Sequence, residues 1–387
     1  MRRVYLDNNA TTPLLPEVLE AMRPYFLEKF GNASSIHQQG QQARAAVEHA
    51  REQVAELLNC RAAEVVFTSG GTEGDNLALF GMVTPGDHVV TSAIEHHAVL
   101  NSCNRLEQMG CTVTYLPVDG RGMVDPDDVR RALRPETKLI SIMFANNETG
   151  VVQAMNEIGK IAAEADVYFH TDAVQAAGKA PIDVKEIGCD LLTISAHKIH
   201  GPQGTGALYV RKGTLLQPLL YGGRHERSRR AGTENVPGIV GLGKAAELAR
   251  LGFTDGKVTQ IEALRDRLES TILGRVEQVA VNGGGAPRTP NTTNISFDCI
   301  EGEAMVIALD LKGLSISTGA ACSSGAIEPS HVLTAMGLPP ERARGSIRFS
   351  IGKQTTVEDI DFALELVPEV VARLREISPV YKKAAVS

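Results

Sequence analysis

The hydrophobic positions of this 387-residue chain change their spacing once, near residue 250. Before that point, short runs rich in Val, Ile and Leu alternate with stretches in which apolar residues recur every three to four positions. The first pattern is typical of buried strands and the second of amphipathic helices. The predicted strands are 64–68, 88–91, 112–115, 139–143, 167–170 and 191–194, and the predicted helices are 74–83, 97–109, 126–133 and 156–165.

This alternation predicts an α/β fold, in which helices cover both faces of a mostly parallel central sheet. Ligands of such sheets bind beyond the carboxyl ends of the strands. We expect a large α/β domain at 15–250 and a smaller α+β domain made of 1–14 and 251–387. The elements predicted in the smaller domain are helices at 257–273 and 358–376 and strands at 292–297, 314–317 and 346–350.

Composition and charge exclude some classes of function. The chain is 43% hydrophobic and 22% charged, which is ordinary for a globular protein. Its net charge of −7 argues against a nucleic-acid backbone as the main ligand, because such binding needs clustered Lys and Arg. No stretch approaches the length of a membrane span, and the first residues lack the apolar core of a signal peptide. We therefore expect a cytoplasmic protein that binds neither nucleic acid nor membrane.

The six cysteines are scattered, and none forms a Cys-x-x-Cys pair, so a resident metal has little support. Several are expected to be reduced and buried, Cys103 among them. Cys322 differs because it lies in the segment 317–326, which is too rich in Gly, Ala and Ser to pack a core. An accessible thiol near a cation is a nucleophile. From these surroundings alone, a reactive and a passive Cys322 are equally open interpretations.

The strongest chemical signal lies at 195–206, directly after the predicted strand 191–194. Lys198 stands there between a buried strand and a tight Gly-rich turn. A partly desolvated lysine near other cations has a lowered pKa, and its neutral amine forms a Schiff base with a carbonyl. Ser195 and His197 flank it with donors suited to a phosphate. The alternative is a lysine that closes the strand and pairs with a carboxylate.

A second candidate anion site is Ser-Gly-Gly-Thr-Glu-Gly-Asp at 69–75, between a predicted strand and a predicted helix. We expect Thr72 to cap this helix, with Asp75 completing a box-like pattern. The glycines, Gly71 among them, let backbone N–H groups approach an anion at the positive end of the helix dipole. No Gly-Lys-Ser/Thr follows, so this is not a Walker loop. A plain turn with a good cap is the alternative.

Three further polar side chains stand at or near predicted strands. Asp172 follows 167–170, where a carboxylate can hold a pyridinium nitrogen protonated or simply cap the next helix. His96 follows 88–91 and either stacks on a flat cofactor and moves protons or is satisfied by backbone hydrogen bonds. Arg348 alternates with apolar neighbours, so it either offers its fork to a carboxylate or lies on the surface of a half-buried strand.

Together and in this order, these motifs resemble the fold-type I pyridoxal-phosphate (PLP) enzymes, and specifically the NifS/IscS group of cysteine desulfurases. The resemblance runs nearly end to end and also includes Tyr-Leu-Asp-Asn-Asn-Ala-Thr-Thr at 5–12 and the segments 31–35, 145–150 and 328–333. It implies an aspartate-aminotransferase-like fold and PLP as cofactor. It also implies conversion of L-cysteine to L-alanine, with the sulfur passed to Cys322 as a persulfide.

The resemblance implies a role for individual residues of the cofactor site. Lys198 holds PLP as a Schiff base and moves protons, and Asp172 pairs with the pyridine nitrogen. Gln175 hydrogen-bonds to the phenolic oxygen of the ring, and His96 stacks on the ring and serves as acid or base. The residues implied to bind the phosphate are Gly71, Thr72, Ser195 and His197, together with Thr233 of a neighbouring subunit.

The resemblance also implies how substrate and partners bind. Asn147 and Arg348 position the substrate carboxylate, and Thr233 implies a homodimer. The long Gly/Ser-rich surroundings of Cys322 resemble the NifS/IscS branch, in which the thiol serves an iron–sulfur scaffold protein or another sulfur acceptor and touches iron–sulfur species only during transfer. A selenocysteine lyase is one alternative. A catalytically inert partner of sulfur-carrier or scaffold proteins is another.

Overall fold

The computed structural model describes residues 2–319, 329–378 and 381. Its larger sheet has seven strands in the order β2-β8-β7-β6-β5-β3-β4. All adjacent pairs are parallel except those made by β8, which runs against both of its neighbours. The strands are β2 (Val65–Thr68), β3 (His88–Ser92), β4 (Thr112–Leu116), β5 (Thr137–Ser141), β6 (Tyr168–Asp172), β7 (Leu191–Ser195) and β8 (Gly206–Val210).

The six strands predicted in this region are confirmed, and the sheet is mostly parallel and flanked by helices. Every residue of β2, β3, β7 and β8 is buried, which is why apolar residues predominate in β2, β7 and β8. The polar residues of β3, His88, Thr91 and Ser92, are buried with hydrogen-bond partners. β5 begins and ends two residues earlier than predicted. β8 was not predicted, and it forms because the chain reverses at Gly204, whose φ of +75° suits glycine, and pairs back on β7.

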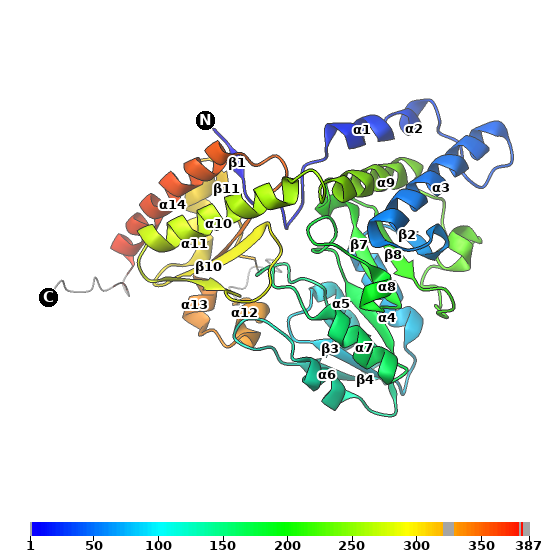
Figure 1. Cartoon of the computed structure of the whole chain (residues 1–387), viewed down its shortest axis with the longest axis horizontal. Helices are drawn as coiled ribbons and strands as arrows, with labels where there is room; N and C mark the ends of the chain where they lie inside the picture. Colours follow the sequence, from blue (N-terminus) through cyan, green and yellow to red (C-terminus); the bar gives the residue numbers. More distant parts are fainter. Residues whose placement is uncertain (1, 320–328, 379–380, 382–387) are drawn as a thin grey trace.

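The helices between these strands are α4 (Gly71–Met82), α5 (His97–Gln108), α6 (Pro126–Ala132) and α7 (Met155–Glu164), as predicted to within three residues at each end. Two long helices were not predicted, α3 (Gln38–Leu58) and α9 (Val236–Leu251). They lie side by side over the sheet (Figure 1). They approach so closely that a Cβ on Gly243 would lie 2.6 Å from the Cα of Ala50.

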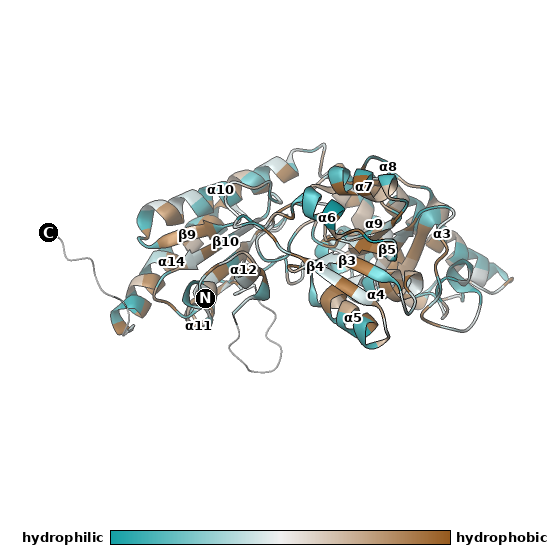
Figure 2. Cartoon of the chain, turned by 90° about the horizontal axis from the view of Figure 1, so that it is seen from below, coloured by the Kyte–Doolittle hydropathy of each residue, from teal (hydrophilic) through white to brown (hydrophobic). Residues whose placement is uncertain are grey.

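The rest of the chain forms a second layer around an antiparallel sheet in the order β12-β10-β9, covered by α10, α11 and α14 (Figure 1). Figure 2 shows that its apolar residues gather on the strands and on the helix faces turned towards them. These elements are β9 (Val279–Asn282), β10 (Thr292–Phe297), β12 (Ser346–Ser350), α10 (Lys257–Arg275), α11 (Gly302–Asp310) and α14 (Val357–Ile377).

The N-terminal strand β1 (Val4–Tyr5) joins this second layer by pairing in parallel with β11 (Leu314–Ser315), which is shorter than the predicted 314–317. Val4 and Leu6 share a core with Phe297 and Phe349. The domain boundary at residue 250 stays a prediction. No helix of the described residues is long and apolar enough to cross a membrane. The remaining short helices are α1 (Pro16–Met22), α2 (Pro24–Leu27), α8 (Val184–Ile187), α12 (His331–Ala335) and α13 (Pro340–Arg344).

Candidate active site

A cavity of about 360 Å³ lies where the carboxyl ends of the central strands meet the second layer. Segments from both layers line it, and Asn9, from the N-terminal stretch, lies at their junction. Ten of the twelve residues predicted for the site contribute to this one cavity. The larger layer contributes Gly71, Thr72, His96, Asn147, Asp172, Gln175, Ser195 at the end of β7, His197 and Lys198. The second layer contributes Arg348 from β12.

Lys198 ends a short 3₁₀ turn (Ala196–Lys198) that follows β7. Its Nζ donates to two backbone carbonyl oxygens, those of Asn9 at 2.7 Å and Ala10 at 2.6 Å. Burial and the nearby guanidinium of Arg348 lower the pKa of Lys198 to about 8, against the opposing pull of Asp172. The amine is therefore deprotonated far more readily than an ordinary lysine.

Asp172 is the last residue of β6, and its Oδ1 accepts a hydrogen bond from the backbone N–H of Val174 at 2.9 Å. The residues that follow form turns, so the alternative in which Asp172 caps a helix is wrong. Burial raises the pKa of Asp172 to about 6, and Lys198 opposes the rise. A buried carboxylate of this kind is stabilised as the anion when a cation faces it.

The Gly-rich segment after β2 differs from the prediction. The helix α4 begins at Gly71 with Gly70 before it, so Thr72 lies inside the first turn and the Thr72–Asp75 capping box is wrong. The backbone N–H groups of a first helical turn have no partner within the helix, which leaves those of Gly71 and Thr72 facing the cavity. The turn packs closely, since a Cβ on Gly71 would lie 2.8 Å from Val174 Cγ2.

Asp75 is fully buried and faces the interior, where its Oδ1 lies 3.6 Å from Nε2 of His170. Burial, with the nearby carboxylate of Asp172, raises the pKa of Asp75 well above its usual range. Asp75 lines the same cavity as Asp172. The sequence analysis missed this second carboxyl group because it assigned the residue to a helix cap.

Two histidines of the cavity are held with one ring nitrogen occupied. Nδ1 of His96 accepts from the backbone N–H of Ala98 at 3.1 Å, as the backbone alternative predicted, and the ring also lines the cavity. Nδ1 of His197 lies 3.1 Å from the hydroxyl of Thr11. Desolvation lowers the pKa of each histidine to about 4, with Lys198 contributing, so both rings are neutral near pH 7.

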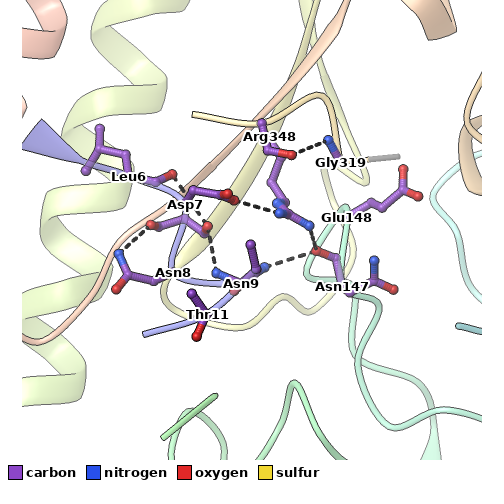
Figure 3. Close-up of polar contacts among 12 residues, drawn as sticks. Leu6, Asp7, Asn8, Asn9, Thr11, Asn147, Glu148, Gly319 and Arg348 are labelled. Carbon is purple, nitrogen blue, oxygen red and sulfur yellow. Dashed lines mark hydrogen bonds and ion pairs between the residues drawn. The ribbon is translucent and has the colours of Figure 1, made fainter. Parts of the chain in front are cut away.

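Arg348 lies on β12, an edge strand of the second layer, and is only 4% exposed, so the alternative of a surface arginine is wrong. Its Nη2 donates to Oδ1 of Asp7 at 2.7 Å and its Nη1 to the carbonyl of Asn147 at 3.0 Å (Figure 3). The same carbonyl accepts from Nδ2 of Asn9. Asn147 thus contacts Arg348 through its backbone, and Asp7 is a residue that the sequence analysis did not single out.

Two predicted residues remain, of which the structure describes only Thr233. Thr233 is exposed and lines a separate pocket together with Arg230 and Ser69. Cys322 lies outside the described residues, although Ser317 and Gly319, shortly before it in the chain, line the cavity.

Three of the cysteines that the structure describes are poorly suited to nucleophilic chemistry. Cys103 is buried, as expected, and burial raises the pKa of its thiol to about 12. Burial has the same effect on Cys60, whose pKa rises to about 12, and raises that of Cys189 further. A thiol is reactive only as thiolate, so these three are inert near neutral pH.

Fold and site together define the class of protein. A mostly parallel sheet carries a lysine of lowered pKa, a buried carboxylate and an anion cradle at one edge, as PLP-dependent enzymes require. The family model described as "Aminotransferase class-V" matches residues 4–362, and the chain belongs to this family.

Within the family the chain is a PLP-dependent cysteine desulfurase. It is 52% identical to the cysteine desulfurase IscS of Dictyoglomus turgidum over 386 residues, which cover 99% of this chain and 98% of that protein. The solved structure of a NifS-like protein superposes with a TM-score of 0.89 at 37% identity, covering 96% of this chain and all of the other. A structure of SspA in complex with cysteine superposes with a TM-score of 0.81 at 37% identity, covering 91% of this chain and all of the other.

The residues present fit PLP. Asp172, a buried carboxylate with a raised pKa, is stabilised by the protonated ring nitrogen that the cofactor would bring. First-turn N–H groups at Gly71 and Thr72, with Ser195 and His197, would hold the phosphate. Lys198 would supply the amine that binds the cofactor covalently.

Proposed function

We propose that the substrate is L-cysteine and that its sulfur passes to Cys322, which becomes a persulfide while L-alanine is released. The substrate C–S bond breaks, an S–S bond to Cys322 forms, and the thiol proton of Cys322 balances the hydrogen gained by alanine. The observation that carries the proposal is the pairing, in one cavity, of Lys198 with its lowered pKa and the buried Arg348. The amine of Lys198 can accept and donate a proton, and the guanidinium of Arg348 can bind a carboxylate.

Different residues of the chain bind the substrate and move its protons. Arg348 and Asn147 hold the substrate carboxylate at the junction of the two layers. Lys198 takes the proton from the substrate Cα, because its amine is largely neutral above pH 8. PLP, when bound, supplies the electron sink for that step.

The remaining residues orient the ring and pass protons. With PLP bound, Asp172 would stay ionised and hold the ring nitrogen, and Gln175 would donate to the ring oxygen. His96 would pack on the ring and could exchange a proton through Nε2, since its Nδ1 is occupied.

Mass spectrometry after incubation with cysteine tests the sulfur transfer. We expect one added sulfur atom on Cys322, none on Cys322→Ser, and full labelling of a Cys60→Ser control. Sulfur found on another cysteine, or full sulfide release by Cys322→Ser, would contradict the proposal. Lys198→Ala should lose the visible absorption of covalently bound cofactor, and its retention would refute the assignment of Lys198. Turnover on cysteine and selenocysteine, with and without Cys322, separates a desulfurase from a selenocysteine lyase.

We also propose a homodimer in which Thr233 of one subunit reaches the phosphate site of the other. Thr233 is exposed and lies outside the cavity of its own chain, which supports this arrangement. Large apolar side chains are also exposed in this chain, including Phe30 at 71% and Tyr221 at 84%. Sedimentation analysis is expected to give twice the chain mass, and Thr233→Ala is expected to weaken PLP binding. A monomer with full PLP affinity would refute the proposal.

The acceptor of the sulfur is proposed to be an iron–sulfur scaffold protein or another cytoplasmic sulfur-acceptor protein. Support comes from the relative named IscS and from Cys60, Cys103 and Cys189, whose raised thiol pKa values leave them poor carriers. Radiolabelled sulfur from cysteine should move from the protein to an added scaffold protein. Transfer that is unchanged in Cys322→Ser would contradict this route.

A further inference from the structure

Lys179 lies in the turn that follows Asp172 and contacts two side chains of the cavity wall. Its Nζ donates to Oε1 of Gln175 at 2.5 Å and to Oδ1 of Asn9 at 3.1 Å. Lys179 does not line the main cavity, so it does not face the position of the ring directly. Lys179 can therefore affect the cavity through its hydrogen bond to Gln175.

The side-chain amide of Gln175 is held by one donor and one acceptor. Oε1 accepts from Lys179, and Nε2 donates to the backbone carbonyl of Asn9 at 3.0 Å. A carbonyl oxygen only accepts, so rotating the amide by half a turn would place the amide oxygen of Gln175 against the carbonyl oxygen of Asn9 and would take away the acceptor that Lys179 uses. Lys179 and Asn9 therefore select one of two orientations that are equal in shape.

This orientation matters because an amide nitrogen carries two N–H groups. One of those on Gln175 is used by Asn9, and Gln175 lines the cavity, so the second is available to a ligand there. In the opposite orientation Oε1 would face the cavity instead. An oxygen-bearing ligand would then meet an acceptor where it needs a donor.

The other acceptor of Lys179 is itself fixed. Oδ1 of Asn9 also accepts from Nδ2 of Asn291 at 2.9 Å, and Nδ2 of Asn9 donates to Thr292 Oγ1 at 2.9 Å. Both partners come from the second layer, at the start of β10, so Asn9 connects Lys179 to a part of the fold other than the turn that carries Gln175.

The two hydrogen bonds of Lys179 do not depend on its charge. Burial, together with the positive charges of Lys198 and Arg348, lowers the pKa of Lys179 well below its usual range. In either charge state the amine keeps at least two N–H groups, enough for the two acceptors, Gln175 and Asn9.

We propose that Lys179 is a positioning residue, which acts through Gln175 to keep an N–H donor turned towards the ring oxygen of bound PLP. The inference rests on the proposed contact of Gln175 with that oxygen. A donor there stabilises the oxygen as an anion, whereas a freed or flipped amide does not. Loss of Lys179 should therefore raise the pH at which the bound cofactor gives up its proton.

The test is a pH titration of the visible absorption of the purified PLP-loaded protein, without turnover. Lys179→Met keeps the length of the side chain and removes the donor, and Lys179→Ala is a second variant with less bulk. We expect both to raise the titration midpoint by about one pH unit, a tenfold change in proton affinity. Lys185→Met, at an exposed lysine that donates to Asn59, is the matched control and should leave the midpoint unchanged.

Gln175→Ala and the double variant Lys179→Met/Gln175→Ala test whether Lys179 acts through Gln175. If Lys179 acts through Gln175, the double variant has the midpoint of Gln175→Ala alone, because the two changes remove the same interaction. Additive shifts, or a Lys179→Met midpoint equal to that of the unmodified protein while Gln175→Ala moves, would overturn the inference. A Gln175→Ala midpoint that does not move would instead overturn the proposed ring contact of Gln175.

Discussion

Arg348 and Asp7 form an ion pair at 2.7 Å between residues 341 positions apart in the chain, with Arg348 almost fully buried (Figure 3). Nε of Arg348 has no hydrogen-bond partner among the described residues, so Asp7 and the carbonyl of Asn147 are what hold the guanidinium. The guanidinium of Arg348 is therefore already held by Asp7 and Asn147 in the absence of substrate.

Asp7→Ala is expected to lower the free energy of unfolding by about 2 kcal/mol, because it leaves the charge of Arg348 buried without its counterion. The double variant Asp7→Ala/Arg348→Met should lose less than the sum of the two single changes. Denaturant unfolding of the four proteins measures this coupling. Strict additivity would show that the ion pair contributes nothing.

Capture of PLP by the cofactor-free protein should follow the deprotonation of Lys198. Its pKa is lowered to about 8, so the rate should rise with pH to a plateau above about 8 and not near 10, where an ordinary lysine loses its proton. Arg348 contributes to the lowering, so Arg348→Gln should move the midpoint upwards. Stopped-flow absorbance gives the rates, and Arg373→Gln, on the exposed side of α14, is the control. An unmoved midpoint in Arg348→Gln would contradict this coupling.

Glu95 should make the protein less stable as the pH rises. Its Oε1 accepts from Ser92 at 2.5 Å and from the N–H of Met143 at 2.9 Å, but burial dominates and raises its pKa to about 8. The folded state therefore binds this proton more tightly than the unfolded state, whose Glu has a pKa of about 4.3. The stabilisation is complete below pH ~4.3 and is lost as the pH rises to about 8.

Glu95→Gln removes this titration, so its stability relative to the unmodified protein should increase between pH 5 and 8, by at most about 1.4 kcal/mol per pH unit. Urea unfolding at each pH measures the difference. Glu303→Gln, at an exposed position of α11, controls for the replacement itself. A pH-independent difference for Glu95→Gln would show that Glu95 is ionised in the folded protein throughout.

Gly159 of α7 allows a close approach to the chain end of α8. A Cβ at this position would lie 1.8 Å from the carbonyl oxygen of Ile187. Gly159→Ala is expected to cost about 1–3 kcal/mol, because backbone must move to make room. Gly274→Ala in α10 meets nothing within 4 Å and should instead stabilise the helix by about 0.5–1 kcal/mol. Thermal unfolding distinguishes the two, and equal melting temperatures would contradict the predicted contrast.

Much of the larger sheet was predictable from local pattern, and so was the position of Lys198. A strand buried on both faces is rich in apolar residues, so β7 was visible from Leu191, Leu192 and Ile194. Helix α9 was missed because its buried face is built from small residues such as Gly238 and Ala245, which give no strong periodicity. The wrong cap at Thr72 has a similar origin, since the glycines before it allow the helix to begin earlier.

The sequence by itself determined six of the seven strands of the larger sheet, the strand ends near Lys198 and Asp172, and ten of the residues that line one cavity. Only the tertiary structure decided that Asp7 holds Arg348 and that Asn9 links Lys179 to the second layer. Burial leaves its pattern in neighbouring residues along the chain, whereas these hydrogen bonds join positions more than 150 residues apart. The spacing of residues along the chain does not predict such partners, because they come into contact only when the two layers pack together.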